Sequence, residues 1–267
     1  CADNKSVSGT IVIKNPAVWN GNADTNWTNT TNWPCGIVPA GTSDVIIPSG
    51  LTNYPVINSG IGNCRNLTIQ TGASVTVIKN GILKIAGNIY NSGKLDASNG
   101  TIEMNGSDAQ SIAGSLFINK TIRNLIVNNM GSGLSVSSTA NDTLKITGLL
   151  SFGNASAVLN TGDNLTLVSN SSGTAAVGIL GGINSINGNV IVERYINTGT
   201  AAGEHPKSWQ FLAAPTSGQT IKQSWMENGT AANYYGTMIS GPGGTAAGFD
   251  ISSPAPSIKY YNYHTKG

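Results

Sequence analysis

Residues 65–104 read RNLTIQTGASVTVIKNGILKIAGNIYNSGKLDASNGTIEM, and they show most clearly how this chain is built. Apolar residues recur in short alternating pairs such as Leu67-x-Ile69 and Leu83-x-Ile85. An alternation with a period of two places these side chains on one face of a β-strand. Dipeptides such as Asn80-Gly81 and Asn99-Gly100 separate the pairs and are typical of turns that need positive φ. The stretch therefore predicts very short strands joined by tight turns.

The same alternation continues as far as residue 192, in Ile102-x-Met104, Leu125-x-Val127, Leu134-x-Val136, Leu144-x-Ile146, Leu165-x-Leu167 and Val190-x-Val192. No segment carries apolar residues at i, i+3, i+4 and i+7 for the length of an ordinary helix, so an all-β chain is predicted. Both an antiparallel sandwich and a parallel β-helix fit this spacing. We favour the β-helix, because the strands are very short and few aromatic residues are available to fill a sandwich. At about 20–25 residues per coil, it would have five or six coils.

Aromatic residues divide the chain into parts. Four lie in residues 1–54, three in 55–190 and ten in 191–267. Because the open ends of a solenoid need covering, the aromatic-rich ends are interpreted as caps. The predicted organisation is an N-terminal strand (1–14), an N-terminal cap (15–64), a β-helix (65–194) and an incomplete, sandwich-like C-terminal β module (195–267).

Composition excludes several classes of function. Charged residues are 10% of the chain, against about 25% in an ordinary soluble domain. The net charge is +2 without a basic run, which argues against nucleic acid as a partner. No apolar stretch approaches the roughly 20 residues of a membrane-spanning helix. The low charge and the 32 asparagines favour an exported surface protein over a cytosolic enzyme.

The three cysteines, Cys1, Cys35 and Cys64, lie in the first quarter of the chain. A disulfide between Cys35 and Cys64 would close a loop of about 30 residues and stabilise the fold by roughly 3–4 kcal/mol. The alternative is a pair of buried thiols. A Cys at position 1 resembles the lipid-anchored residue of a mature bacterial lipoprotein, although the numbering could equally start where a processed fragment starts.

The search for catalytic and metal-binding residues gives weak candidates. Asp96, Glu103 and Asp108 come nearest to a carboxylate cluster, with Lys94 beside them, and solvated surface charges are the favoured interpretation. The two histidines lack the context of a nucleophilic triad. Oxygen-bearing side chains at residues 20–26 resemble a calcium loop with too few carboxylates, so an Asx-rich turn is favoured. No metal or cofactor is expected.

Two sets of aromatic residues are candidates for contact with other molecules. Trp19, Trp27 and Trp33 would either pack as the cap or form a platform for sugar rings. The second set would contact other subunits or glycans, with subunit contacts favoured because Tyr is enriched at protein interfaces. It consists of Tyr234, Tyr235, Tyr260 and Tyr261.

Several stretches together resemble secreted surface proteins of Bacteroidota, many of which are cargo of the type IX secretion system. The matching stretches are Trp19-Asn20-Gly21, Asp44-Val45-Ile46-Ile47-Pro48, Asn66-Leu67-Thr68-Ile69, Val192-Glu193-Arg194-Tyr195-Ile196 and Trp209-Gln210-Phe211-Leu212-Ala213-Ala214-Pro215. The resemblance implies an exported, surface-attached or fibrous protein and marks no active site. Asp142-Thr143-Leu144 is similar to the O-glycosylation motif of these bacteria, which makes Thr143 a candidate glycan site.

The sequence thus predicts a non-enzymatic extracellular protein, either a subunit of a bacterial surface fibre or an adhesin stalk. Copies would join head to tail, with the N-terminal strand donated to the C-terminal module of a neighbour. The residues of that strand are Val7, Ile11, Val12 and Ile13. A carbohydrate-binding adhesive module that uses the three tryptophans is the first alternative, and a polysaccharide-degrading β-helix enzyme is the second.

Overall fold

The structure is a computed structural model, and it describes residues 15–195, 218–220 and 223. The chain divides into two units, Cys1–Asn197 and Thr198–Gly267, and the fold described below belongs to the first. The predicted N-terminal strand with Val7, Ile11, Val12 and Ile13 lies outside the described residues. So do Tyr234, Tyr235, Tyr260 and Tyr261 and almost all of the predicted C-terminal module.

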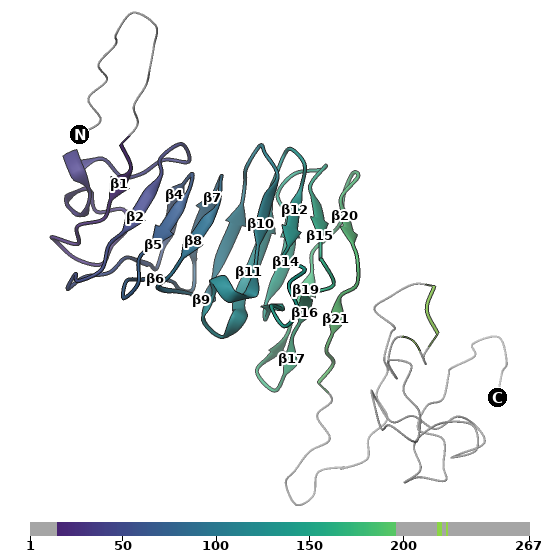
Figure 1. Ribbon diagram of the computed structural model, residues 1–267. Helices are drawn as coiled ribbons and strands as arrows, with labels where there is room; N and C mark the ends of the chain where they lie inside the picture. The colour runs from purple at the N-terminus through teal and green to yellow at the C-terminus, as the bar shows by residue number, and fades with distance from the viewer. Residues whose placement is uncertain (1–14, 196–217, 221–222, 224–267) are drawn as a thin grey trace, which may run out of the picture. The chain divides into compact units, whose positions relative to one another are not determined.

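Residues 17–192 form a parallel β-solenoid (Figure 1), as the alternation predicted. Every strand pairing among the described residues is parallel except for one two-stranded hairpin. Residues 15–195 contain no α-helix. The antiparallel sandwich is therefore excluded, because its hairpins would pair neighbouring strands antiparallel.

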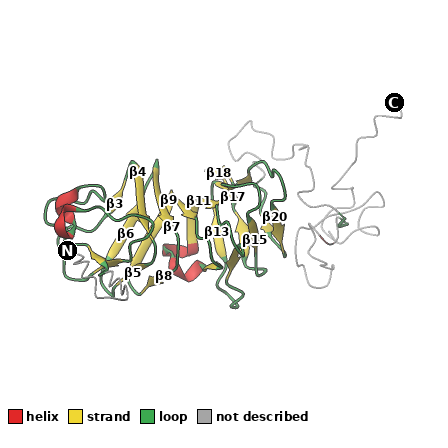
Figure 2. Cartoon of the chain, turned by 90° about the horizontal axis from the view of Figure 1, so that it is seen from above, coloured by secondary structure: helices red, strands yellow, loops and turns green. Residues whose placement is uncertain are grey.

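The strands line up into sheets that run along the stack (Figure 2). One four-stranded sheet contains β1 (Ala17–Val18), β2 (Val45–Ile47), β5 (Leu67–Ile69) and β8 (Ile89–Asn91). A second contains β10 (Gln110–Ile112), β12 (Leu134–Val136), β15 (Val158–Asn160) and β20 (Ser185–Asn187). The largest has eleven strands: β3 (Val56–Ile57), β4 (Gly60–Cys64), β6 (Ser74–Val77), β7 (Gly81–Ile85), β9 (Lys94–Met104), β11 (Thr121–Val127), β13 (Leu144–Ile146), β14 (Leu149–Phe152), β16 (Leu165–Leu167), β19 (Ala176–Val177) and β21 (Ile191–Val192).

Short irregular elements complete the solenoid. The hairpin consists of β17 (Ser169–Asn170) and β18 (Gly173–Thr174). Four 3₁₀ turns are present among residues 15–195: η1 (Thr30–Asn32) and η2 (Pro34–Gly36) near the N-terminal end, and η3 (Gly114–Leu116) and η4 (Ile118–Lys120) between β10 and β11.

The coils differ in length along the stack. Val45 pairs with Leu67, which pairs with Ile89, so the early coils are equal in length. The paired residues Leu125 and Leu150 are further apart in the sequence, so the coil between them is longer. The sheet that starts with β10 has no counterpart in the earliest coils, and the sheet that contains β1 and β2 ends at β8.

The core is a column of aliphatic side chains, each stacked on its counterpart in the next coil. Leu83, Ile102, Leu125 and Leu150 pair in that order on adjacent strands, and all four are fully buried. Burying an aliphatic side chain of this size contributes about 1.5–3 kcal/mol. In β7 the inward residues are buried and those between them are half-buried, which confirms the period of two read from the sequence.

The parallel ladder begins earlier than the predicted boundary at residue 65. Ala17 already pairs with Val45, and Val45 pairs with Leu67, so β1 and β2 belong to the coils. β4, also within the predicted cap, pairs with β7 along its whole length. The predicted far boundary agrees better, since β21 still pairs with β16 at Val192.

The Asn-Gly dipeptides do not all work as predicted. Asn80 has a positive φ of 70°, whereas Gly81 and Gly100 do not adopt positive φ. A Cβ added at Gly81 would lie 2.0 Å from the carbonyl oxygen of Ile57, and one at Gly100 would lie 2.4 Å from that of Val77. Glycine is required at these two positions because the backbone of the preceding coil passes too close for a side chain.

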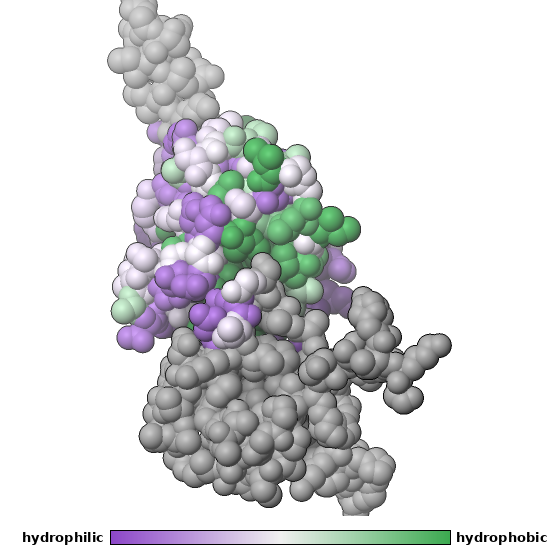
Figure 3. Space-filling view, turned by 90° about the vertical axis from the view of Figure 1, so that its right-hand side faces the viewer, coloured by the Kyte–Doolittle hydropathy of each residue, from purple (hydrophilic) through white to green (hydrophobic). Residues whose placement is uncertain are grey.

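The two ends of the solenoid differ in what covers them. The N-terminal end carries buried tryptophans, whereas the last coil exposes aliphatic side chains (Figure 3).

Candidate functional site

The three N-terminal tryptophans form one cluster inside the cap. Trp19 and Trp27 each pack edge-on against Trp33, with ring centroids 5.0 Å apart in both pairs. All three side chains are buried. The indole Nε1 of Trp19 donates to the carbonyl of Asn53 (2.8 Å), and that of Trp33 donates to the carbonyl of Trp27 (2.6 Å). The buried rings agree with the cap interpretation and leave no exposed ring surface that could serve as a platform for a sugar.

The loop between Trp19 and Trp33 uses its polar side chains internally. The Asn32 amide donates to Asp24 Oδ1 (2.7 Å), and its oxygen accepts from the backbone N–H of Ala23 (2.9 Å). Hydrogen bonds, first of all from Asn29, hold the pKa of Asp24 below its ordinary value. The Asn26 side-chain oxygen likewise accepts from the loop's own backbone. These contacts describe an Asx-rich turn, and the described residues contain no group of three His, Cys, Asp or Glu able to hold a metal.

The predicted disulfide between Cys35 and Cys64 is wrong. Cys64 is a free thiol, fully buried at the end of β4, and its Sγ donates weakly to the carbonyl of Lys84 (3.7 Å). Burial, with a smaller effect of the Asp44 charge, raises the pKa of this thiol. Cys35 is disulfide-bonded, but it lies exposed in η2, whereas Cys64 points into the core. Sequence spacing does not show which way either side chain points.

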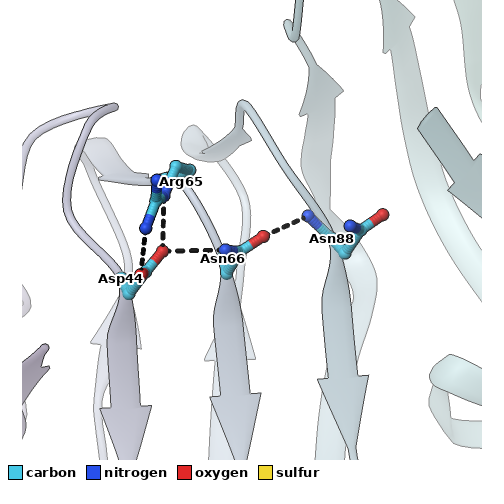
Figure 4. A network of polar contacts seen from close by, with 4 residues as sticks. All are labelled: Asp44, Arg65, Asn66 and Asn88. Atoms are coloured by element: carbon cyan, nitrogen blue, oxygen red, sulfur yellow. Dashed lines mark hydrogen bonds and ion pairs between the residues drawn. The ribbon is translucent and has the colours of Figure 1, made fainter. Parts of the chain in front are cut away.

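A ladder of polar side chains follows one corner of the first coils (Figure 4). The Asn66 amide donates to Asp44 Oδ1 (2.8 Å), and the Asn66 side-chain oxygen accepts from the backbone N–H of Asn88 (2.8 Å). Arg65 donates to both carboxylate oxygens of Asp44 and holds its pKa below the ordinary value. The ladder thus joins three successive coils through side chains.

Similar ladders join the later coils. The Asn128 amide donates to Glu103 Oε1 (2.8 Å), and its oxygen accepts from the Asn154 amide (3.1 Å). At another corner the Asn124 amide donates to Thr101 (3.1 Å), and its oxygen accepts from the N–H of Leu149 (2.9 Å). Ladders of Asn or Thr are expected at the turns of a β-helix, but the sequence did not show which residues form them, although Asn66 and Asn88 are separated by one coil repeat.

The carboxylates considered for catalysis do not converge. Glu103 is almost fully buried and forms an ion pair with Lys84 across β7 and β9, with Nζ and Oε2 2.9 Å apart. Asp96 lies in the part of β9 that pairs with β6, and its Oδ1 accepts from Ser98 (2.7 Å). Asp108 is exposed in a separate turn, so the three acids share no common face.

Thr143 lies half-buried at the corner that leads into β13. The neighbouring Asp142 carboxylate accepts hydrogen bonds from the backbone and hydroxyl of Ser115. This corner is therefore fixed against η3, and glycosylation of Thr143 stays a prediction.

The comparisons with known proteins give one match. Residues 18–125 match a domain of unknown function (DUF8693). No curated protein and no solved structure matches the chain. The matched region covers the tryptophan cap together with the first coils, in agreement with a ladder that begins at Ala17. In the described part of the chain, no helix has the length and apolar character needed to cross a bilayer.

Proposed function

We propose that this chain is a non-enzymatic structural protein of the bacterial exterior, a subunit of a surface fibre or an adhesin stalk that assembles head to tail through β-strand contacts. A β-solenoid is consistent with a structural or adhesive protein. The observation that carries the proposal is the stack of parallel coils from Ala17 to Val192, whose first and last strands pair on one side only among the described residues. Head-to-tail joining of such units gives an open filament.

The use of polar groups within the solenoid supports a load-bearing role over catalysis. Asp44, Glu103 and the corner asparagines direct their hydrogen bonds to neighbouring coils. A polysaccharide-cleaving site needs carboxylates that converge on the scissile bond, and Asp96, Glu103 and Asp108 lie apart. We therefore expect no release of reducing ends from a panel of polysaccharides.

Location at the cell surface is part of the same proposal. It rests on the low charge, on the abundance of asparagine and on the resemblance to secreted Bacteroidota proteins. A glycan on Thr143 and subunit contacts through Tyr234, Tyr235, Tyr260 and Tyr261 belong to the same proposal. A lipid on Cys1 does not, because Cys35 is disulfide-bonded and Cys64 is a free thiol, which leaves no other cysteine of the chain to pair with Cys35. Peptide-mass measurement on native material tests the glycan.

Electron microscopy and sedimentation of the purified chain test assembly. We expect filaments that disappear when residues 1–14 are deleted, while the circular dichroism spectrum keeps its β signature. Replacing Ile11 and Ile13 by Lys should act like the deletion, since both lie on the apolar face predicted for the strand. Thr10→Lys, on the opposite predicted face, is the matched control. Filaments that survive the deletion unchanged would contradict strand donation.

A further inference from the structure

Exposed aliphatic side chains gather on the last coil of the solenoid. Ile179 is 96% exposed and Ile183 is 76% exposed. Val177, Leu180 and Ile191 on the same coil are also exposed, and Figure 3 shows the apolar patch on this end of the solenoid. In contrast, the inward residues of the preceding coils are buried. Single exposed aliphatic residues are normal on a protein surface, whereas a contiguous patch of them marks an interaction surface.

The backbone of this coil is open as well. Among the described residues, β19 pairs only with β14, β20 only with β15, and β21 only with β16. Within the described part of the chain, each strand therefore has one edge whose N–H and C=O groups face no other strand. Such an edge is a template for another parallel strand.

The last coil also lacks the charges that normally protect an edge. From Asn164 to Val192 the sequence contains no Asp, Glu, Lys, Arg or His. Monomeric β-proteins block unwanted pairing with charged residues, Lys above all, on their edge strands. The absence of charge over this whole stretch favours an edge that is covered in the assembled protein.

The N-terminal end of the solenoid has complementary features. β1 pairs only with β2 among the described residues, so no described strand occupies its outer edge. Ile37 is 68% exposed there and lines a shallow hollow of about 150 Å³ together with Pro16, Ala17 and Pro39. Residues 25–43 contain no charged side chain. Since all coils run in the same direction, the first coil of one copy can follow the last coil of another without reversing strand polarity.

We propose that the last coil, residues 176–192, is a docking surface for the N-terminal end of a second copy of this chain, centred on Ile37 and the outer edge of β1. This inference rests on the proposed head-to-tail assembly and assigns the surfaces that meet. The contact is heterologous, because the two faces differ, and each added copy leaves a new free last coil. It is separate from strand donation by residues 1–14, which involves the C-terminal module.

The first test introduces charge into the patch. The double variant Ile179→Lys, Ile183→Lys should weaken self-association, measured by sedimentation velocity, by a factor of about 100, since each aliphatic contact is worth roughly tenfold in affinity. Met130→Lys is the matched control, because Met130 is 71% exposed but lies in the middle of the stack. We expect the control to assemble like the unmodified chain.

The second test places the two surfaces against each other. Oxidation of the variant Ile37→Cys, Ile183→Cys should give a ladder of covalent multimers, and Ile37→Cys, Met130→Cys should not. The single variant Ile183→Cys should react with maleimide when the protein is diluted to monomers and become protected on assembly.

The outcomes separate this inference from the proposed function. Assembly that is unaffected by the lysine pair would overturn the proposed docking surface but would not contradict the proposed filament. An introduced thiol in Ile183→Cys that is already unreactive in the monomer would show that the same chain covers the patch, and would overturn the inference. An unmodified chain that stays monomeric at every concentration would overturn both proposals.

Discussion

At the scale of single residues, glycine sets how closely the coils can stack. Gly81 and Gly100 have no positive φ, and yet a Cβ at either position would collide with a carbonyl oxygen of the preceding coil. Neighbouring strands of a sheet lie about 4.8 Å apart, which leaves no room for a side chain that points along the stack. The sequence signal is therefore a glycine at a coil corner, and its physical reason is contact rather than turn geometry.

Gly81→Ala tests this reason. The added Cβ would lie 2.0 Å from the carbonyl oxygen of Ile57, so the backbone must shift, and we expect a loss of about 1–3 kcal/mol in the free energy of unfolding. Gly41→Ala is the control, because no atom lies within 4 Å of its added Cβ and its φ is not positive. The control should change stability by less than about 0.5 kcal/mol. Urea unfolding followed by circular dichroism measures both, and equal effects would argue against the close-approach explanation.

At the scale of elements, corner ladders fix one coil on the next. Asp44 accepts hydrogen bonds from Arg65 and from the Asn66 amide, and the Asn66 side-chain oxygen accepts one from the backbone N–H of Asn88. The Asp44–Arg65 pair is partly exposed, so solvent screens it and we expect it to contribute little to stability. The ladder therefore specifies the alignment of the coils more than it stabilises them.

The pH dependence of stability should reveal the Asp44 contact. Its pKa in the folded protein is held below the ordinary value, chiefly by the hydrogen bond from Arg65. A lowered folded pKa stabilises the fold above the unfolded pKa, near about 3.9, and the gain is lost as the pH falls through the folded pKa. The difference in unfolding free energy between the wild type and Asp44→Asn should thus be positive at pH 7 and vanish in acid.

A matched variant isolates this effect from other acids. Asp108→Asn removes an exposed carboxylate in a separate turn and should leave the pH profile almost unchanged. A difference between wild type and Asp44→Asn that grows toward low pH would contradict the assignment. Thermal unfolding at several pH values supplies the measurement.

The strands could be read from sequence, but their grouping into cap and coils could not. The pairs around Leu67 and Leu83 show the period of two because their inward positions are all aliphatic. Val45-Ile46-Ile47 has the same burial pattern, but it follows a Trp-rich segment, which suggested a separate cap. Which residues turn inward at a corner also depends on the coil path, and this is why the Cys35–Cys64 prediction failed.

At the scale of the whole solenoid, the tryptophan cluster forms the core of the N-terminal end. Trp33 holds Trp19 and Trp27 in edge-on contact, so Trp33→Ala should leave a cavity and cost about 3–5 kcal/mol in the free energy of unfolding. Tyr90→Ala is the control, since Tyr90 is largely exposed on β8. Thermal melting compares the two variants. A melting temperature for Trp33→Ala close to that of the control would show that the tryptophan cluster does not stabilise the fold.

The solenoid as a whole should open from its last coil. In a stack of coils each one is stabilised mainly by its neighbours, so a coil with a neighbour on one side only is the least stable. Among the described residues, β19, β20 and β21 each pair on one side only, and residues 176–192 carry exposed aliphatic side chains. β9 and β11, in contrast, are the longest strands described and pair on both sides. Hydrogen exchange of the dilute chain should be fastest in residues 176–192 and slowest in β9 and β11. Assembly should then slow exchange in residues 176–192 and leave exchange in β9 and β11 unchanged, because docking supplies the last coil with its missing neighbour. Equal protection of all coils in the dilute chain would contradict the prediction that the last coil is the least stable.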